Sequence, residues 1–96
     1  MYLILWESNP AAYPSDPDER MKIYMSNIEK VKKDLKSGDV LMWGINVAGG
    51  SGFTITKDDP KQSFANSMIY TPYIKAEVRP MLSLDEMMEV MQAMQK

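Results

Sequence analysis

The chain has 96 residues, of which 45% are apolar and 25% charged, and this composition is typical of one globular domain spanning residues 1–96. Its formal net charge of −2 argues against nonspecific nucleic-acid binding, which needs a basic surface. The absence of cysteine and histidine excludes disulfides, thiolate chemistry, and the commonest general base and metal ligand. We therefore expect neither a metal site nor a cofactor.

The first predicted element is a strand at residues 2–7, where a short apolar run is typical of a strand buried on both faces. The run has no basic segment before it, stops at Glu7, and is too short for a signal peptide or a membrane span. We therefore expect a cytoplasmic protein without a membrane partner. The apolar side chains alternate, with Leu3 and Leu5 on one face and Tyr2, Ile4 and Trp6 on the other.

A long helix is predicted to begin after Asp16 and to stop at Gly38. Asp16 can cap the helix, Pro17 suits its first position, and Glu19 follows the cap at the spacing of a capping box. Lysines gather near its C-terminal end, where the helix dipole favours them, and we interpret them as a solvated face: Lys30, Lys32, Lys33 and Lys36. Apolar residues at helical spacing predict a stripe facing the core: Met21, Tyr24, Ile28, Val31 and Leu35.

Glycines between two alternating runs predict a β-hairpin and not a nucleotide site. The runs at residues 40–48 and 52–57 both alternate as strands do, and a glycine-rich link joins them. Gly44 and Gly49 have the spacing of a phosphate-binding loop, but the lysine of that loop is missing. The glycines also lead into a strand, whereas a phosphate loop leads into a helix. We attribute them to the positive φ angles that tight turns need.

A second helix is predicted to begin after Asp59, with Gln62 at the back-reaching position, and to end near Tyr70. Its apolar residues Phe64 and Met68 are expected to face the core. The acidic segments that open this helix and the first one superficially resemble metal ligands. Neither has the spacing of a calcium loop, and both fit helix starts better: Asp58-Asp59 and Asp16-Pro17-Asp18-Glu19.

A fourth strand is predicted at residues 73–79 and a last helix after Ser83, which forms a capping box with Glu86. The strand places Ile74, Ala76 and Val78 on one face and Tyr73, Lys75, Glu77 and Arg79 on the other. The last helix carries an apolar stripe that is interpreted as a core or partner contact: Leu84, Met87, Met88, Met91 and Met94.

The order β-α-β-β-α-β-α predicts an α+β domain: a ferredoxin-like βαββαβ unit with an added C-terminal helix, in which two helices cover one face of a four-stranded antiparallel sheet. Through the opening "MYLILWES", the central hairpin and the end "YTPYIKAEVRPMLSLDEMMEVM", the chain resembles the dimeric α/β-barrel proteins, a ferredoxin-like superfamily, and within it the muconolactone-isomerase-like group and related short families. The resemblance implies a small-molecule-binding protein or enzyme, for which an isomerase or a cofactor-free oxygenase is typical. Many members use a histidine, which this chain lacks.

The candidate catalytic pair is Glu77 and Arg79, which lie two apart on a strand and therefore on the same side, beside Lys75. In a pocket, Arg79 would bind a substrate carboxylate and Glu77 would move a proton. The alternative is a salt-bridge network on a wet face. Further residues are candidates for lining the same cavity: Tyr2, Trp6, Glu7, Trp43, Asn46 and Tyr73.

Two classes of function remain open: a small-molecule-binding protein or enzyme, and a non-catalytic structural or regulatory homodimer. An RNA-binding domain shares the βαββαβ order, but "SGFTIT" keeps only the Gly-aromatic part of its motif and the net charge has the wrong sign. In both open classes we expect a homodimer that packs sheet on sheet. Two helices cover one face of the predicted sheet, and the other face would expose an apolar patch that a twofold partner could bury.

Overall fold

The computed structural model describes residues 1–57 and 59–95. In this part of the chain four strands and three α-helices form, which confirms the predicted α+β class and the four-stranded antiparallel sheet. The elements are β1 (Tyr2–Ser8), a short 3-10 helix η1 (Pro10–Ala12), α1 (Pro17–Ser37), β2 (Val40–Ile45), β3 (Ser51–Thr56), α2 (Pro60–Tyr70), β4 (Ile74–Pro80) and α3 (Leu84–Met94).

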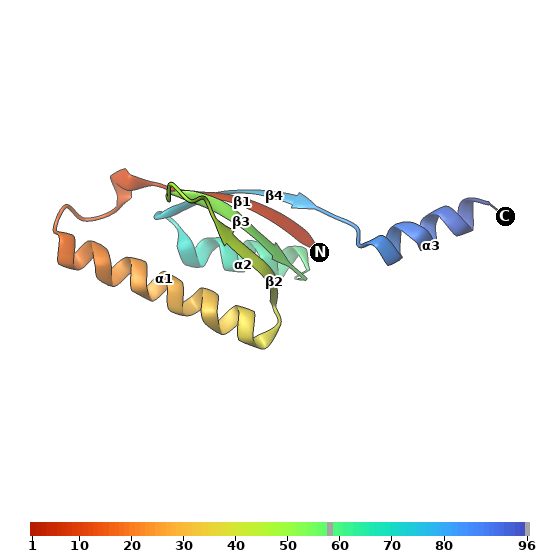
Figure 1. Ribbon diagram of the computed structural model, residues 1–96, viewed down its shortest axis with the longest axis horizontal. Helices are drawn as coiled ribbons and strands as arrows, with labels where there is room; N and C mark the ends of the chain where they lie inside the picture. Colours follow the sequence, from red (N-terminus) through yellow and green to blue (C-terminus); the bar gives the residue numbers. More distant parts are fainter. Residues whose placement is uncertain (58, 96) are drawn as a thin grey trace.

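The strands lie in the order β2-β3-β1-β4, and each pair of neighbours is antiparallel. It follows that β1 and β2 are parallel to each other with β3 between them, and that β3 and β4 are parallel with β1 between them. Each of the crossovers β1-α1-β2 and β3-α2-β4 therefore spans one inserted antiparallel strand. Both crossover helices lie on the same side of the sheet (Figure 1).

The two faces of the sheet follow the predicted alternation except at Tyr73, which was predicted on the face of Glu77 but precedes β4 and packs against Tyr13 on the inner side. The inner face, which looks toward α1 and α2, includes Ile4, Ile74 and Ala76. The open face, which no helix covers in Figure 1, includes Leu5 and Glu77, and the register pairs these two residues. Successive side chains of a strand point to opposite faces of the sheet, so the register of one strand residue determines which residues lie on each face.

The hairpin is confirmed, but β2 is shorter than the predicted strand 40–48. It ends at Ile45, and residues 46–50 form the turn. The Asn46 side chain accepts a hydrogen bond from the Ala48 amide at 2.9 Å, which competes with extension of the strand. Gly49 and Gly50 have φ angles of 78° and 80°, so both need the left-handed conformation that glycine adopts without strain.

At two further glycines, an aromatic ring from one strand lies over the neighbouring strand. A Cβ atom at Gly52 would meet the indole ring of Trp6, and one at Gly44 would meet the phenyl ring of Phe53. The indole of Trp6 stacks on that of Trp43, with ring centroids 5.7 Å apart and planes 19° apart. The rings of β1 and β3 thus reach neighbouring strands over positions that lack a side chain, Trp6 on the inner side and Phe53 on the open side.

The helix starts agree only in part with their predicted caps. Asp16 stands at the N-cap of α1, but its side chain makes no capping hydrogen bond. Asp59 does cap α2, because its Oδ1 accepts from the Gln62 amide at 2.8 Å. The side chain of Gln62 donates to Asn66 instead of reaching back to the cap. The capping box of α3 is complete in both directions, between Ser83 and Glu86.

The predicted inward face of α2 is wrong. Phe64 and Met68 are 67% and 55% exposed. The helix instead buries Ser63 and turns Ser67 and Tyr70 toward the sheet. The exposed residues and the sheet-facing residues both repeat at helical spacing. The sequence therefore indicated that α2 has an apolar face, but not whether this face packs against the sheet.

The chain buries little of its apolar surface. Among the described residues, Tyr13 and Val40 are the buried large apolar side chains. The chain exposes 7190 Å², whereas a compact protein of 11.0 kDa is expected to expose about 5,600 Å². Its radius of gyration is 16.1 Å, against about 12.5 Å for a compact domain of this length. Helix α3 contributes to both values, because it projects from the end of the sheet (Figure 1).

Candidate functional site

A cavity of about 360 Å³ lies between the inner face of the sheet and helices α1 and α2. We call it the inner cavity. Its floor is formed by β-strand residues and its walls by α1 and α2, which contribute Ile28 and Tyr70 among others. Most of its surface is apolar or aromatic, as expected for a site that takes a small organic molecule. Its principal aromatic residues are Trp6, Tyr13, Tyr24, Trp43 and Tyr70.

Three tyrosines pack together beside the cavity. The ring of Tyr13 lies 4.7 Å from that of Tyr24 and 5.1 Å from that of Tyr73, measured between centroids. Tyr13 follows η1 and is 7% exposed, so the short helix directs one of the most buried side chains of the chain against α1. Tyr13 and Tyr24 line the cavity, and the Tyr73 ring packs against that of Tyr13.

Two polar atoms in the wall of the inner cavity are buried without a hydrogen-bond partner in the described part of the chain: Trp6 Nε1 and Thr56 Oγ1. Thr56 is 2% exposed. A buried polar group that lacks a partner destabilises a protein by roughly 1–3 kcal/mol, so such groups call for an explanation. The two groups are one donor-only indole N–H and one hydroxyl, set in an apolar wall.

The inner cavity also has a polar side, which contains Asp34 and Tyr70. Burial raises the pKa of the Tyr70 phenol, and the negative charge of Asp34 raises it further. The phenol therefore stays protonated at neutral pH and can donate a hydrogen bond. The ammonium group of Lys30 lies over the Tyr70 ring, 5.7 Å from its centroid, and helps to hold the ring in place.

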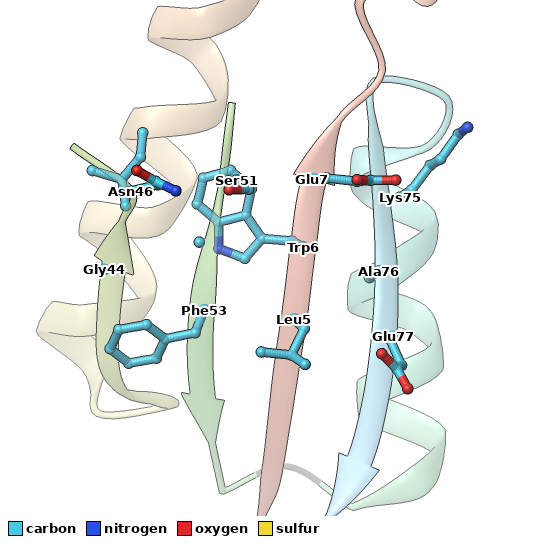
Figure 2. Close-up of a pocket in the computed structure, with 12 residues that line it drawn as sticks. Leu5, Trp6, Glu7, Gly44, Asn46, Ser51, Phe53, Lys75, Ala76 and Glu77 are labelled. Atoms are coloured by element: carbon cyan, nitrogen blue, oxygen red, sulfur yellow. The ribbon is translucent and has the colours of Figure 1, made fainter. Parts of the chain in front are cut away.

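The open face carries a wider and shallower hollow of about 790 Å³, bordered by Leu5, Glu7, Phe53 and Glu77 among others. Figure 2 shows Phe53 on β3, Leu5 and Glu7 on β1, and Glu77 on β4, with Lys75 extending away from Glu77. The Arg79 guanidinium pairs with the Glu77 carboxylate at 3.0 Å, and both side chains are more than half exposed. An exposed ion pair of this kind contributes about 0–1 kcal/mol.

The structure does not bring all the predicted site residues together. Those on the open face are Glu7, Asn46, Lys75 and Glu77, with Arg79 joined to them through its ion pair. Trp43 lines the inner cavity and Tyr73 packs beside it, on the other side of the sheet. Trp6 borders both hollows, and Tyr2 lines neither.

Sequence reasoning also missed part of the inner cavity, namely Tyr13, Thr56 and Tyr70. Tyr13 lies in a segment that the sequence presents as a loop, and Thr56 resembles any other strand threonine. Tyr70 falls in the last turn of α2, where the nearby Pro72 marks the end of the helix. Tyr70 follows Met68 and Ile69 at the apolar end of α2, and this position was the one signal that could have pointed to a buried ring.

Acidic residues do not gather into a metal site within residues 1–57 and 59–95. Asp58 of the predicted Asp58-Asp59 pair lies outside these residues, and Asp59 serves as the α2 cap. No helix in the described ranges is long and apolar enough to cross a membrane. No protein-family model matches the chain, and no curated protein matches it at a significant level.

Proposed function

We propose that the chain is a small-molecule-binding protein of the dimeric α/β-barrel type, and that its ligand occupies the inner cavity. The strand order, read from the other edge as β4-β1-β3-β2, and the two interlocked crossovers support a ferredoxin-like arrangement. The observation that carries the ligand proposal is the pair of unpartnered polar atoms, Trp6 Nε1 and Thr56 Oγ1, in the wall of an otherwise aromatic cavity.

The cavity defines a class of ligand. Its volume lies near the lower end of the roughly 300–1,000 Å³ range of small-molecule sites, so the ligand is small. Stacked indoles and the tyrosine rings favour a flat, apolar body. The Trp6 N–H needs an acceptor and the Thr56 hydroxyl can take either role. A planar molecule with one hydroxyl or carbonyl group has the required body and can bond one of these two groups. It cannot bond both, because Thr56 lies four residues, or about 13 Å, along β3 from Gly52, which pairs with Trp6.

If the chain is an isomerase or oxygenase, its proton chemistry belongs in the same cavity. Asp34 and Tyr70 line that cavity, whereas Glu77 and Arg79 lie on the opposite face of the sheet and hold each other in an exposed ion pair. The Glu77–Arg79 pair then shapes the open surface and does not touch the ligand.

The proposal includes a homodimer formed through the open face. Phe53, Leu5 and Ile55 lie on this face without a helix over them. Large apolar surfaces are rare on soluble monomers, and a second copy would cover this one with the same surface. The alternative function, a non-catalytic structural or regulatory homodimer, shares this interface and differs only in having no ligand in the inner cavity.

The experiment is a titration followed by NMR, using 1-naphthol as the probe and naphthalene as a probe that lacks the hydroxyl. The chain has two tryptophans, so their indole N–H signals report on the cavity directly. We expect saturable shifts of the Trp6 indole signal. We also expect Thr56→Val to weaken 1-naphthol binding about 5-fold, the value of one hydrogen bond, without changing naphthalene binding.

Glu77→Gln provides the matched control on the open face and is expected to leave both affinities unchanged. If neither probe shifts the indole signals saturably, the ligand proposal is wrong and the non-catalytic homodimer is favoured. If Glu77→Gln weakens binding and Thr56→Val does not, the ligand site lies on the open face instead.

A further inference from the structure

Helix α3 is well formed at its start but has no surface to pack on. The Ser83 hydroxyl accepts from the Glu86 amide at 3.1 Å, and the Glu86 carboxylate accepts from the Ser83 amide at 3.0 Å. Every residue of α3 is nevertheless exposed. A helix of 11 residues is marginal on its own in water, so its stability has to come from packing.

The helix carries an apolar stripe between acidic flanks. Leu84, Met87 and Met91 recur at helical spacing and are 70%, 41% and 48% exposed. Within Leu84–Met94 there are three acidic residues and no basic one, so the surface that receives α3 should be apolar with basic residues around it: Asp85, Glu86 and Glu89 are the acids.

The strand register shows where such a surface lies. Pro80 pairs with Tyr2, Tyr2 with Thr56, and Thr56 with Val40. The end of β4, from which α3 leaves, is therefore at the same end of the sheet as the start of β2. At this corner α1 also ends, with its C-terminal lysines. We call this corner the β2 corner; its exposed apolar side chains are Leu35, Leu41 and Met42.

Within one chain α3 reaches the β2 corner only by lying across the open face. Strands β4 and β2 are opposite edges of the sheet, three strand spacings or about 14 Å apart. The connection at residues 81–83 spans about 10 Å when extended. Folding back across the open face of the same chain is possible in length, because α3 is itself about 16 Å long. The helix, about 10 Å wide, would then occupy the surface proposed for the second copy.

A second copy removes this difficulty. When two open faces pack about a twofold axis that runs along the strands, the β4 edge of each copy lies opposite the β2 edge of the other. The β2 corner of the partner then stands at the same end of the sheet as the start of α3. We propose that α3 crosses to the second copy and packs its methionine stripe on the β2 corner there, an inference that rests on the homodimer proposed above.

Charge and area both fit this arrangement. The last two turns of α1 at the β2 corner carry Lys33 and Lys36 as well as Lys32, which pairs with Glu29, and one acid, Asp34. Their net positive charge complements the acids that flank the α3 stripe. The chain exposes about 1,600 Å² more than a compact protein of its mass. One side of a standard interface accounts for about 800 Å². The excess therefore matches two contact surfaces on each chain, the open face and the arm with its docking corner.

The test uses cysteine cross-linking, because the chain has no cysteine of its own. A Met91→Cys chain and a Leu41→Cys chain, distinguished by terminal tags of different length, are mixed and treated with a short bismaleimide. We expect a covalent species that contains one chain of each kind, about 22 kDa or twice 11.0 kDa. Ala93→Cys in place of Met91→Cys is the matched control and should link at least 5-fold less, since Ala93 lies about 160° round α3 from Met91 and is exposed.

The light-scattering mass of the unmodified chain separates the possible failures. A dimer mass without the mixed cross-link would show that α3 does not reach the partner's β2 corner, while the homodimer itself would stand. A mixed cross-link that forms equally well through Ala93→Cys would overturn the stripe as the contact. A monomer mass at every concentration would overturn the homodimer and the arm together.

Discussion

The inner and open faces of the sheet are made by alternate residues of the same strands, yet they differ in what covers them. On the inner face, two helices and a tyrosine cluster enclose a cavity in which Thr56 is 2% exposed. On the open face, Leu5 and Phe53 border a shallow hollow with an exposed ion pair at its margin. Apolar residues on a strand therefore identify a surface that must be covered, whereas the covering layer decides whether that surface becomes a binding cavity or an interface.

The largest expected effect is on the open face. Leu5→Glu would place a carboxylate in the proposed dimer contact of both copies, and a buried charge without a partner is strongly unfavourable. We expect the dimer dissociation constant to rise at least 100-fold, measured by sedimentation velocity. Binding of 1-naphthol in the inner cavity should stay within about 2-fold. Loss of both properties together would mean that the two faces are not independent.

The next effect concerns the Trp6 ring, which lies over Gly52 and stacks on Trp43 on the inner face. At Gly52, a side chain would collide with the Trp6 ring and with the backbone oxygen of Gly44. We expect Gly52→Val to lower the free energy of unfolding by about 3 kcal/mol, the upper part of the range for overpacked sites. Urea denaturation followed by tryptophan fluorescence measures this loss.

The matched control for Gly52→Val is Gly49→Ala. At Gly49 a Cβ atom would meet nothing within 4 Å, so only the positive φ angle of 78° opposes the substitution. We expect a loss of about 1 kcal/mol. Equal losses of unfolding free energy at Gly49 and Gly52 would contradict the proposal that Gly52 is needed to make room for the Trp6 ring.

A smaller effect is expected at the ion pair of the open face. Glu77→Gln and Arg79→Ala each remove one partner of a pair that is more than half exposed. We expect either change to alter the free energy of unfolding by less than about 1 kcal/mol. Thermal denaturation at low and high salt checks this. A loss of several kcal/mol would show that the pair is buried in the assembled protein.

The smallest effect is the pH response of α3. Hydrogen bonds from the Ser83 backbone amide and then from its side chain lower the pKa of Glu86. A lowered pKa means that the cap stabilises the helix above the usual glutamate value of 4.5 and loses this contribution as the pH falls below it. The Ser83 amide signal in NMR should report this loss, and Glu86→Gln should remove the titration while keeping a capping side chain.

Much of the fold could be predicted because strand periodicity is strict. Alternation placed Leu5 and Trp6 on opposite faces before any contact was known, and the glycine-rich link located the hairpin. The sequence did not predict that β2 ends at Ile45. The next residue, an asparagine, accepts a hydrogen bond from its own turn, but in sequence it cannot be distinguished from a strand residue. Asn46 is that residue.

The candidate site was harder to predict than the fold. Trp43 and Glu77 were expected to share a cavity, but the sheet separates them. The α2 stripe of Phe64 and Met68 was expected in the core and is exposed. Core and interface draw on the same apolar residues, so periodicity alone could not tell which layer would cover each stripe.

The most direct test of the account is the mass of the unmodified chain in solution, because both the covered open face and the α3 arm depend on a second copy. Light scattering at low micromolar concentration should give about 22 kDa, twice the chain mass of 11.0 kDa. A mass of about 11 kDa that persists as the concentration is raised would contradict the account, since an apolar open face and an unpacked α3 would then both remain in water.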